Sequence, residues 1–177
     1  MDRRPFYLRR PVLVRQREAM SCWAAALESW LSVCCPGSQY SEAWAIRAFS
    51  RWQAGDSRIE WEGLKAAAGL FRMRSEEVGV GALTPDYLEE KLRSGGHLYI
   101  TYIPTPGPVA AHTVVVYGIG NAAVDVMDPE EGYVSQPHEF FLSRTRALVC
   151  WPPCAGGVIP DPSGRVKWFL ESGLIAP

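Results

Sequence analysis

The sequence of 177 residues has no long apolar run and almost no net charge. Its longest apolar stretch is far shorter than the roughly 18 residues that a membrane helix needs, and residues 1–10 contain no apolar signal-peptide core. With 18 basic and 19 acidic residues, the formal charge is −1, which argues against nucleic acid or an anionic membrane as the main partner. We therefore expect a globular protein with no membrane insertion and no nucleic-acid binding. It is expected to be cytoplasmic in the producing cell, or secreted by a route without a Sec signal peptide.

The chain has five cysteines, which is an odd number, so at least one thiol is unpaired within a single chain. A secreted disulfide scaffold normally has an even number of cysteines in a shorter chain, and a structural zinc site has two closely spaced pairs. We therefore expect no cofactor. A redox or metal protein that uses Cys34-Cys35 and Cys150-x3-Cys154 is the alternative, and the redox state of these four thiols is left open. The five are Cys22, Cys34, Cys35, Cys150 and Cys154.

The first half of the chain has the hydrophobic spacing of amphipathic helices. Pro36-Gly37 ends the first pattern, and Thr84-Pro85 has the cap and proline that are typical of a helix start. The four predicted helices span residues 22–34, 41–52, 61–71 and 84–95.

After Gly96 the pattern changes to short runs rich in Val, Ile and Tyr, separated by Pro and Gly clusters. Helices followed by an antiparallel sheet are typical of the α+β class. We see no linker, so we expect residues 1–177 to form a single domain, in which 166–174 is a short surface helix or a docking tail. The predicted strands are 98–103, 112–119, 124–128 and 147–151.

Cys22 is the one cysteine that is predicted to open a helix. At the first turn of a helix, unpaired N–H groups and the helix dipole favour the thiolate, which is the nucleophilic form. Cys34 and Cys35 lie at the opposite end of the same helix, where the dipole opposes a thiolate. A packed apolar cysteine is the alternative for Cys22. A nucleophilic role requires a base, an orienting group and an oxyanion donor elsewhere in the chain.

His112 and Asp128 are the candidates for the base and its orienting group. His112 begins one predicted strand, and Asp128 ends the next, 16 residues later (128 minus 112). If the strands form a hairpin centred on Gly120, residue i faces residue 240 minus i, so the two side chains face each other. A two-residue turn at Gly120-Asn121 would shift the pairing by one, so we predict an odd-length connection or a bulge there. Asp125 has the wrong parity and is expected on the other face.

Gln16 precedes Cys22 by six residues (22 minus 16), in the loop before the helix. Its amide is placed to donate to a developing oxyanion together with the backbone N–H of Cys22. Taken alone, a glutamine in a polar segment is a solvated loop residue. The other histidines, His97 and His138, lack a partnering pattern and are expected at the surface or in loops.

Together these residues resemble the papain-like cysteine peptidases. The shared features are Gln16-x5-Cys22-Trp23, His112 leading a Val-rich strand, and Asp128-Pro129. A small residue before the cysteine and an aromatic residue after it are typical of the papain nucleophile. The strand 98–103, the Asp-Pro-x-x-Gly run and Phe140-Phe141 look more like the compact bacterial branch. That branch includes the leader-peptidase domains of peptide exporters and short secreted effector proteases.

The resemblance implies a papain-like fold, in which a helical part with the nucleophile at the start of its central helix precedes an antiparallel sheet carrying His and Asp. It implies that Cys22 is the nucleophile and that His112 is the general base. Asp128 would orient the imidazole, and Gln16 would donate to the oxyanion. Three features depart from papain: Met20-Ser21 replaces Gly-Ser, Asp replaces Asn, and the Cys-to-His separation is only 90 residues (112 minus 22).

The expected activity is that of a thiol hydrolase, namely a cysteine protease that cleaves peptide bonds through an acyl-thioester, in a bacterial effector or toxin. The same groups also serve a glutamine deamidase or transglutaminase and a peptidoglycan amidase, so these stay as alternatives. A non-catalytic peptide-binding module on the same fold is a further alternative, although such modules typically lack the Cys or His. The expected partners are a protein or peptide substrate and a cognate inhibitor or immunity protein.

Overall fold

The computed structural model describes residues 4–104 and 110–153. Two features considered above, the segment 166–174 and Cys154, lie outside the described residues. The helices are α1 (Cys22–Cys34), α2 (Glu42–Ala48), the 3-10 helix η1 (Ser50–Trp52), α3 (Trp61–Leu70), α4 (Pro85–Gly95) and α5 (His138–Leu142). The strands are β1 (Phe6–Tyr7), β2 (Arg74–Gly79), β3 (Leu98–Ile103), β4 (His112–Ile119), β5 (Ala123–Asp128), β6 (Gly132–Pro137) and β7 (Arg146–Trp151).

The predicted helix starts are confirmed, and side-chain caps explain two of them. The side chain of Ser41 accepts a hydrogen bond from the backbone N–H of Trp44 at the start of α2. Thr84 accepts one from Tyr87 at the start of α4, where Pro85 has no N–H to leave unpaired. The second predicted helix is shorter than expected, because α2 ends at Ala48 and the chain continues as η1.

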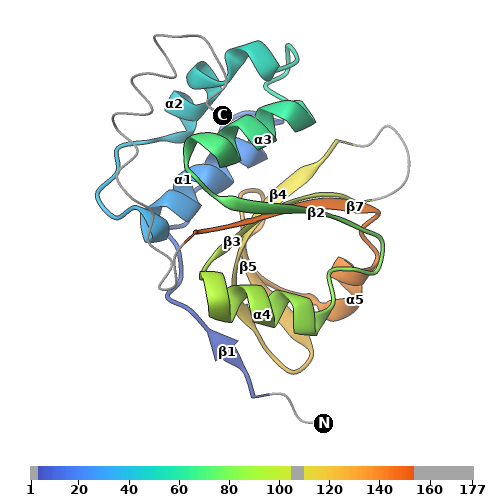
Figure 1. The fold of residues 1–177 in the computed structure, drawn as a ribbon. Helices are drawn as coiled ribbons and strands as arrows, with labels where there is room; N and C mark the ends of the chain where they lie inside the picture. Colours follow the sequence, from blue (N-terminus) through green and yellow to red (C-terminus); the bar gives the residue numbers. More distant parts are fainter. Residues whose placement is uncertain (1–3, 105–109, 154–177) are drawn as a thin grey trace.

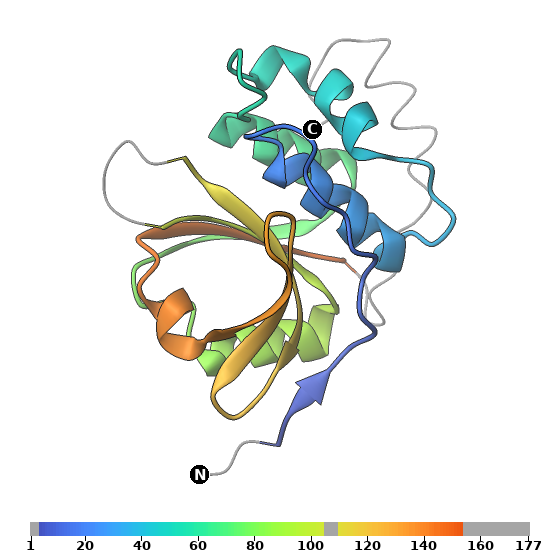
Figure 2. The same cartoon turned by 180° about the vertical axis from the view of Figure 1, so that it is seen from behind.

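All strand pairings are antiparallel, and the sheet order is β2-β7-β3-β4-β5-β6. The short strand β1 pairs with the end of β4, beyond the last residue that β3 pairs. Helices α1, α2 and α3 gather on one side of this curved sheet, and α4 and α5 lie on the other (Figures 1 and 2). The α+β prediction is therefore confirmed.

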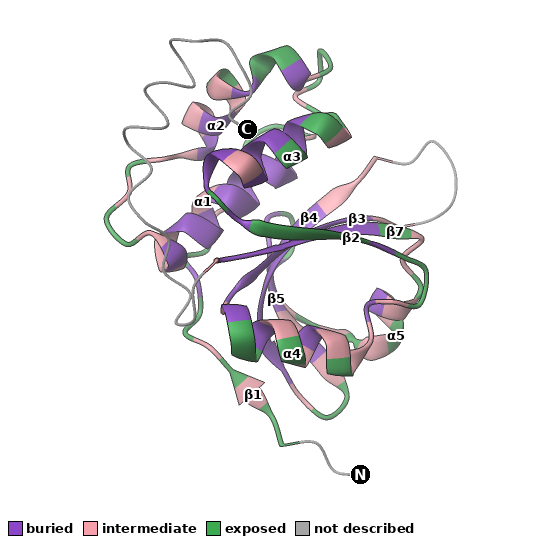
Figure 3. Cartoon of the chain, viewed as in Figure 1, coloured by how far each residue is buried: buried purple, intermediate pink, exposed green. Residues whose placement is uncertain are grey.

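Each face of the sheet contributes to a separate hydrophobic core. On β3, Tyr99 packs in the core formed with α1, α2 and α3, whereas Ile100 packs in the core formed with α4 and α5. This alternation follows from the two-residue period of a strand. Because both faces are covered, β3 and β4 are buried along nearly their whole length (Figure 3), which explains their continuous apolar sequences.

The expected order of helices first and sheet second is wrong at three elements: β1 precedes the helices, β2 lies among them, and α5 lies between β6 and β7. Strand β2 lies between α3 and α4 in the chain, yet it pairs along its whole length with β7. It forms an edge of the sheet, and only Val78 among its residues is buried (Figure 3). A strand with four polar residues in a row shows no hydrophobic alternation, so the sequence pattern did not indicate it.

Trp30 anchors α1 in the core, and its loss is expected to be costly. The side chain is fully buried, and its indole N–H donates to the carbonyl of His97 at 2.9 Å. Trp30→Ala is expected to lower the free energy of unfolding by about 3–5 kcal/mol, because it leaves a cavity and an unpaired carbonyl. Urea unfolding measures this, with the exposed Val80→Ala as the control, expected within about 0.5 kcal/mol of the parent. A Trp30→Ala protein as stable as the control would contradict this packing.

Candidate active site

Cys22 is the first residue of α1, as predicted. Its side chain is 6% exposed, and its sulfur lies 3.9 Å from the carbonyl oxygen of Ala111, the residue just before His112. The start of α1 is therefore in contact with the start of β4. This contact brings the thiol beside a strand that begins 90 residues later in the chain (112 minus 22).

His112 and Asp128 are hydrogen-bonded to each other. The Nε2 atom of His112 lies 2.8 Å from Oδ2 of Asp128. Because Nε2 is used in this way, Nδ1 is the ring nitrogen left for the Cys22 thiol. The arrangement places the three predicted groups in sequence, from thiol to imidazole to carboxylate.

The register that joins these strands differs from the one that we predicted. Val115 pairs with Met127, so residue i faces residue 242 minus i in this part of the hairpin, instead of 240 minus i. Continuing that register places Asp128 across from Val114, two residues from His112, so the side chains meet diagonally. The predicted bulge is present, but it falls between Val116 and Gly118 and not at the turn. The even parity is preserved, and with it the shared face.

Asp128 is a buried carboxylate with several donors around it. Its Oδ1 atom accepts hydrogen bonds from the backbone N–H groups of Glu130 and Glu131, at 2.7 and 3.2 Å. Burial raises the pKa of Asp128, but the hydrogen bonds from His112 and these two N–H groups bring it below its ordinary value. Asp125 bonds the hydroxyl of Ser135 instead of reaching the imidazole. The structure therefore holds Asp128 ionised and oriented.

The electrostatic environment of His112 favours its protonated form. Burial lowers the pKa of the imidazole. The hydrogen bonds and charges of Asp128 and Cys22 raise it by a larger amount, so the net pKa of His112 is about 10. An imidazolium beside a thiol is the arrangement that activates cysteine nucleophiles. The geometry therefore places a protonated imidazole beside the Cys22 thiol at neutral pH.

Gln16 lies beside the same turn as Asp128. Its backbone N–H donates to the carbonyl of Pro129 at 3.1 Å, and the preceding Arg15 bonds the carbonyl of Glu130. The side-chain Nε2 of Gln16 donates to the carbonyl of Ala19 at 3.0 Å. An amide NH₂ carries two hydrogens, so this bond leaves one for another acceptor. The segment before Cys22 is thus tied to the turn that carries the carboxylate.

Besides the residues of this arrangement, the described part of the chain contains two histidines and three cysteines. His97 was expected at the surface or in a loop: it lies in the loop between α4 and β3 but is not at the surface, because it is 8% exposed and its Nε2 contacts the carbonyl of Arg9 at 2.6 Å. Burial lowers the pKa of His97, as expected for a neutral ring. Cys34 and Cys150 are free and buried, and burial raises the pKa of each, to about 12 for Cys150.

An aromatic cluster beside His112 was not anticipated from the sequence. The Tyr102 ring lies 5.8 Å from the imidazole and 5.6 Å from Phe140, measured between centroids. The guanidinium of Arg144 covers the Phe140 ring at 4.0 Å. Tyr102 is directly opposite His112 in the β3–β4 pairing. Antiparallel pairing of the two predicted strands is the signal that would have found it.

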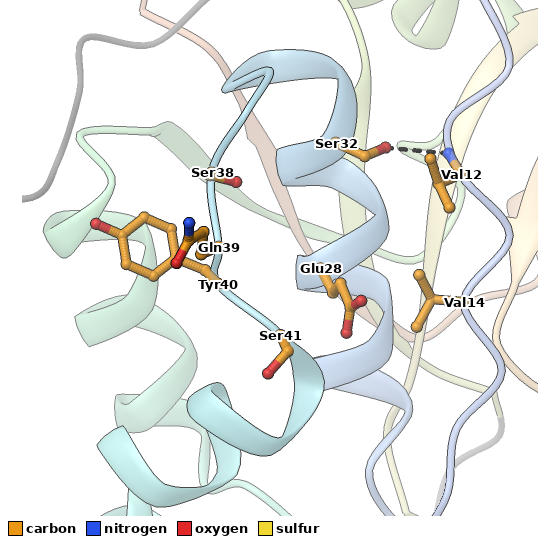
Figure 4. A pocket seen from close by; sticks show the side chains of 8 residues that line it. All are labelled: Val12, Val14, Glu28, Ser32, Ser38, Gln39, Tyr40 and Ser41. Carbon is orange, nitrogen blue, oxygen red and sulfur yellow. Dashed lines mark hydrogen bonds between the residues drawn. The ribbon is translucent and has the colours of Figure 1, made fainter.

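The described part of the chain also has a cavity of about 270 Å³ between the amino-terminal segment, α1 and the start of α2 (Figure 4). None of the predicted site residues is among the side chains that line it, so it is separate from the cysteine and histidine. Across residues 4–104 and 110–153, no group of three His, Cys, Asp or Glu side chains is placed to hold a metal ion. No helix in these ranges has the length and apolar content to span a bilayer. The lining residues are Val12, Val14, Glu28, Ser32, Ser38, Gln39, Tyr40 and Ser41.

A sequence model of the family described as Papain-like cysteine protease AvrRpt2 matches residues 8–146, which are most of the chain. The chain belongs to this family. It is therefore a papain-like cysteine protease, and the matched range contains Gln16, Cys22, His112 and Asp128. No curated protein matches the chain.

Solved structures that resemble this cysteine protease have the same fold. The peptidase domain of Streptococcus ComA, a bifunctional ABC transporter of a quorum-sensing pathway, has a TM-score of 0.59 at 22% identity, over 79% of this chain and 97% of that one. A double glycine motif protease from an AMS/PCAT transporter, in complex with its leader peptide, has a TM-score of 0.54 at 20% identity, over 85% and 99%. A C39-like peptidase from Bacillus anthracis has a TM-score of 0.59 at 12% identity, over 86% and 100%.

Proposed function

We propose that this cysteine protease cleaves peptide bonds through an acyl-thioester on Cys22, with His112 as general base and acid. Asp128 orients the imidazole, and Gln16 donates to the oxyanion. The observation that carries the proposal is the 2.8 Å hydrogen bond between His112 and Asp128, next to Ala111, whose carbonyl oxygen lies 3.9 Å from the Cys22 sulfur. A nucleophile, a base and an orienting group in hydrogen-bond sequence are what acyl transfer requires.

The reaction begins from the thiolate of Cys22 and the imidazolium of His112. The thiolate attacks the carbonyl carbon of the peptide bond, and the carbonyl oxygen becomes an oxyanion held by the backbone N–H of Cys22 and the amide of Gln16. As the intermediate collapses, the C–N bond breaks and the Nδ1 proton of His112 passes to the leaving amine. The products of this step are the free amine and an acyl-thioester on Cys22.

Hydrolysis of the thioester then regenerates the enzyme. His112, now neutral, accepts a proton from water, and the resulting hydroxide attacks the thioester carbon. The C–S bond breaks, the carboxylic acid product leaves, and the sulfur returns as a thiolate beside the imidazolium. Asp128 keeps Nε2 protonated throughout, which leaves Nδ1 as the atom that carries the transferred proton.

We also propose a protein or peptide substrate and a role as a bacterial effector or toxin with a cognate inhibitor or immunity protein. One structural neighbour is a protease in complex with a leader peptide, which supports a peptide substrate for this chain too. The test is to incubate the protein and its Cys22→Ala variant with candidate target proteomes and to map new protein termini. New termini that depend on Cys22 are expected. Ammonia release without new termini would overturn the protease assignment in favour of a deamidase.

The proposed pair makes a specific prediction for pH. The pKa of His112, about 10, is above its ordinary value, so the imidazolium persists at neutral pH and is lost as pH rises through that value. Asp128→Asn removes a charge that raises this pKa, so the alkaline limit of kcat/KM is expected to move to lower pH by about one unit or more. NMR titration of the His112 ring, together with the kcat/KM profile, measures the shift.

Asp125→Asn is the matched control for this measurement. It lies on the same strand, three residues earlier (128 minus 125), and bonds Ser135 instead of His112. Its pH profile is expected to match that of the parent protein. If Asp128→Asn and Asp125→Asn give the same alkaline limit as the parent, Asp128 does not control the imidazole.

A further inference from the structure

The carboxylate of Glu42 is buried against the segment that joins Gln16 to Cys22. Glu42 is the first residue of α2 and is 1% exposed. Its Oε1 atom accepts a hydrogen bond from the backbone N–H of Arg17 at 2.9 Å and another from the hydroxyl of Ser21 at 2.6 Å. Its Oε2 atom lies 3.6 Å from Nε of Arg17. One side chain from a different helix therefore holds both ends of residues 17–21.

These two contacts act on the immediate neighbours of the proposed catalytic groups. Arg17 follows Gln16, and Ser21 precedes Cys22. Between them, the segment is closed on itself, because the Ser21 hydroxyl accepts from the N–H of Glu18 at 3.2 Å. The segment also supplies the Ala19 carbonyl that holds the Gln16 amide. A displacement of residues 17–21 would thus move both the thiol and the amide.

A buried carboxylate is costly unless it is paired and hydrogen-bonded. Each contact that we describe for the carboxylate oxygens of Glu42 comes from residues 17–21. An apolar side chain of the same size would fill the space but would not accept from the Arg17 N–H or the Ser21 hydroxyl. Oε1 is therefore satisfied by this segment, whereas the buried Oε2 has no hydrogen-bond partner among the described residues and lies 3.6 Å from Nε of Arg17. The position of Glu42 at the first turn of α2 also suits an anion.

We propose that Glu42 is a positioning residue. It holds residues 17–21 so that the Gln16 amide and the Cys22 thiol both contact the same acyl group of the substrate. The inference rests on the proposed function, because it assigns Gln16 to the oxyanion. An oxyanion donor acts only when it is fixed at hydrogen-bond distance from the developing charge, within about 0.5 Å. Glu42 affects the reaction through this geometry without touching the reacting atoms.

Two reactions of the Cys22 thiol distinguish a positioning role of Glu42 from a general contribution of Glu42 to packing. Acylation of Cys22 by p-nitrophenyl acetate passes through a tetrahedral oxyanion and releases a burst of p-nitrophenolate. Alkylation by iodoacetamide is a displacement at carbon that forms no oxyanion. Glu42→Ala is expected to slow the Cys22-dependent burst by about 30-fold, part of the 10²–10³-fold effect of losing an oxyanion donor. Alkylation is expected to stay within about twofold of the parent rate, because it needs only the thiolate.

Matched serine variants provide the control. Ser21 and Ser29 are both fully buried, but the Ser21 hydroxyl bonds Glu42, whereas that of Ser29 bonds the carbonyl of Val12. Ser21→Ala is expected to lower the ratio of burst to alkylation rate, and Ser29→Ala is expected to leave it unchanged. Glu42→Gln keeps the volume and one acceptor oxygen, so it is expected to fold and to lower the ratio by a smaller factor. If Glu42→Ala does not fold, the two rates are compared between the parent and Glu42→Gln instead.

The outcomes are distinct from those that test the proposed function. If the parent protein gives no burst that Cys22→Ala removes, the catalytic assignment fails. If the burst depends on Cys22 but the ratio is the same in the parent, Glu42→Gln and Ser21→Ala, the positioning role of Glu42 is overturned. Equal losses of burst and alkylation would also overturn it, since they would indicate a general disturbance of the thiol.

Discussion

Cys22→Ala is expected to lower kcat/KM for peptide-bond cleavage by about four orders of magnitude or more. The variant has no atom that can form the acyl-thioester, so any remaining rate comes from substrate binding and from the oxyanion donors. The thiol is nearly buried, and its sulfur contacts the Ala111 carbonyl at 3.9 Å and the His112 ring. Alanine fits this space, so the thermal unfolding transition of the variant is expected to stay close to that of the parent.

Cys34→Ala is the control, because this thiol lies at the other end of the same helix and burial raises its pKa. Its activity is expected to equal that of the parent. Iodoacetamide mapping by mass spectrometry gives a second measurement, in which Cys22 is expected to react first at pH 6 and the buried Cys34 and Cys150 last. A Cys22→Ala protein that keeps a tenth of the parent activity would contradict the assignment of the nucleophile.

His112→Ala is expected to lower kcat/KM by about 10³–10⁴-fold. The imidazole has two functions in the proposed reaction, since it stabilises the thiolate and protonates the leaving amine. A higher pH restores the thiolate in the variant but supplies no acid for the amine. Alkylation of Cys22 is therefore expected to be slow at pH 6 and to recover near pH 9, while peptide cleavage stays low at both values.

His138→Ala serves as the comparison, because His138 begins α5 and has no bond to Asp128 or Cys22 among the contacts that we describe. Both its alkylation rate and its cleavage rate are expected to match the parent. Recovery of peptide cleavage in His112→Ala at pH 9 would show that His112 acts only on the thiolate and not as the acid.

The elements that carry the site could be predicted because local sequence specifies them. A helix that starts at Cys22 and a strand that starts at His112 follow from hydrophobic spacing and from the breakers around them, and both starts are confirmed. The pairing between β4 and β5 was predicted two residues away from its actual register. The reason is the turn, which is centred between Asn121 and Ala122 instead of on Gly120, so residue i faces residue 243 minus i beside it. The bulge after Val116 then changes the sum by one, to 242, and periodicity gives no signal for either feature.

The surroundings of the site depend on contacts that no local pattern encodes. From the sequence, Glu42 is an ordinary acidic residue in the first turn of a predicted helix. Acidic residues at such positions are usually exposed. Its burial arises because α2 packs against the segment before Cys22. Similarly, His97 lies in a loop, which the sequence allowed, but its burial depends on contacts with Arg9 of the amino-terminal segment and Trp30 of α1.

The three proposed catalytic groups come from opposite sides of one sheet and from distant parts of the chain. Cys22 precedes His112 by 90 residues and Asp128 by 106 (112 and 128 minus 22). Synthesis proceeds from the amino terminus, so the thiol leaves the ribosome long before the imidazole and carboxylate exist. Only after β4 and β5 have joined the sheet against α1 are the three groups in contact. A nascent or truncated chain that ends before residue 112 therefore lacks two of the three groups on which the proposed reaction depends.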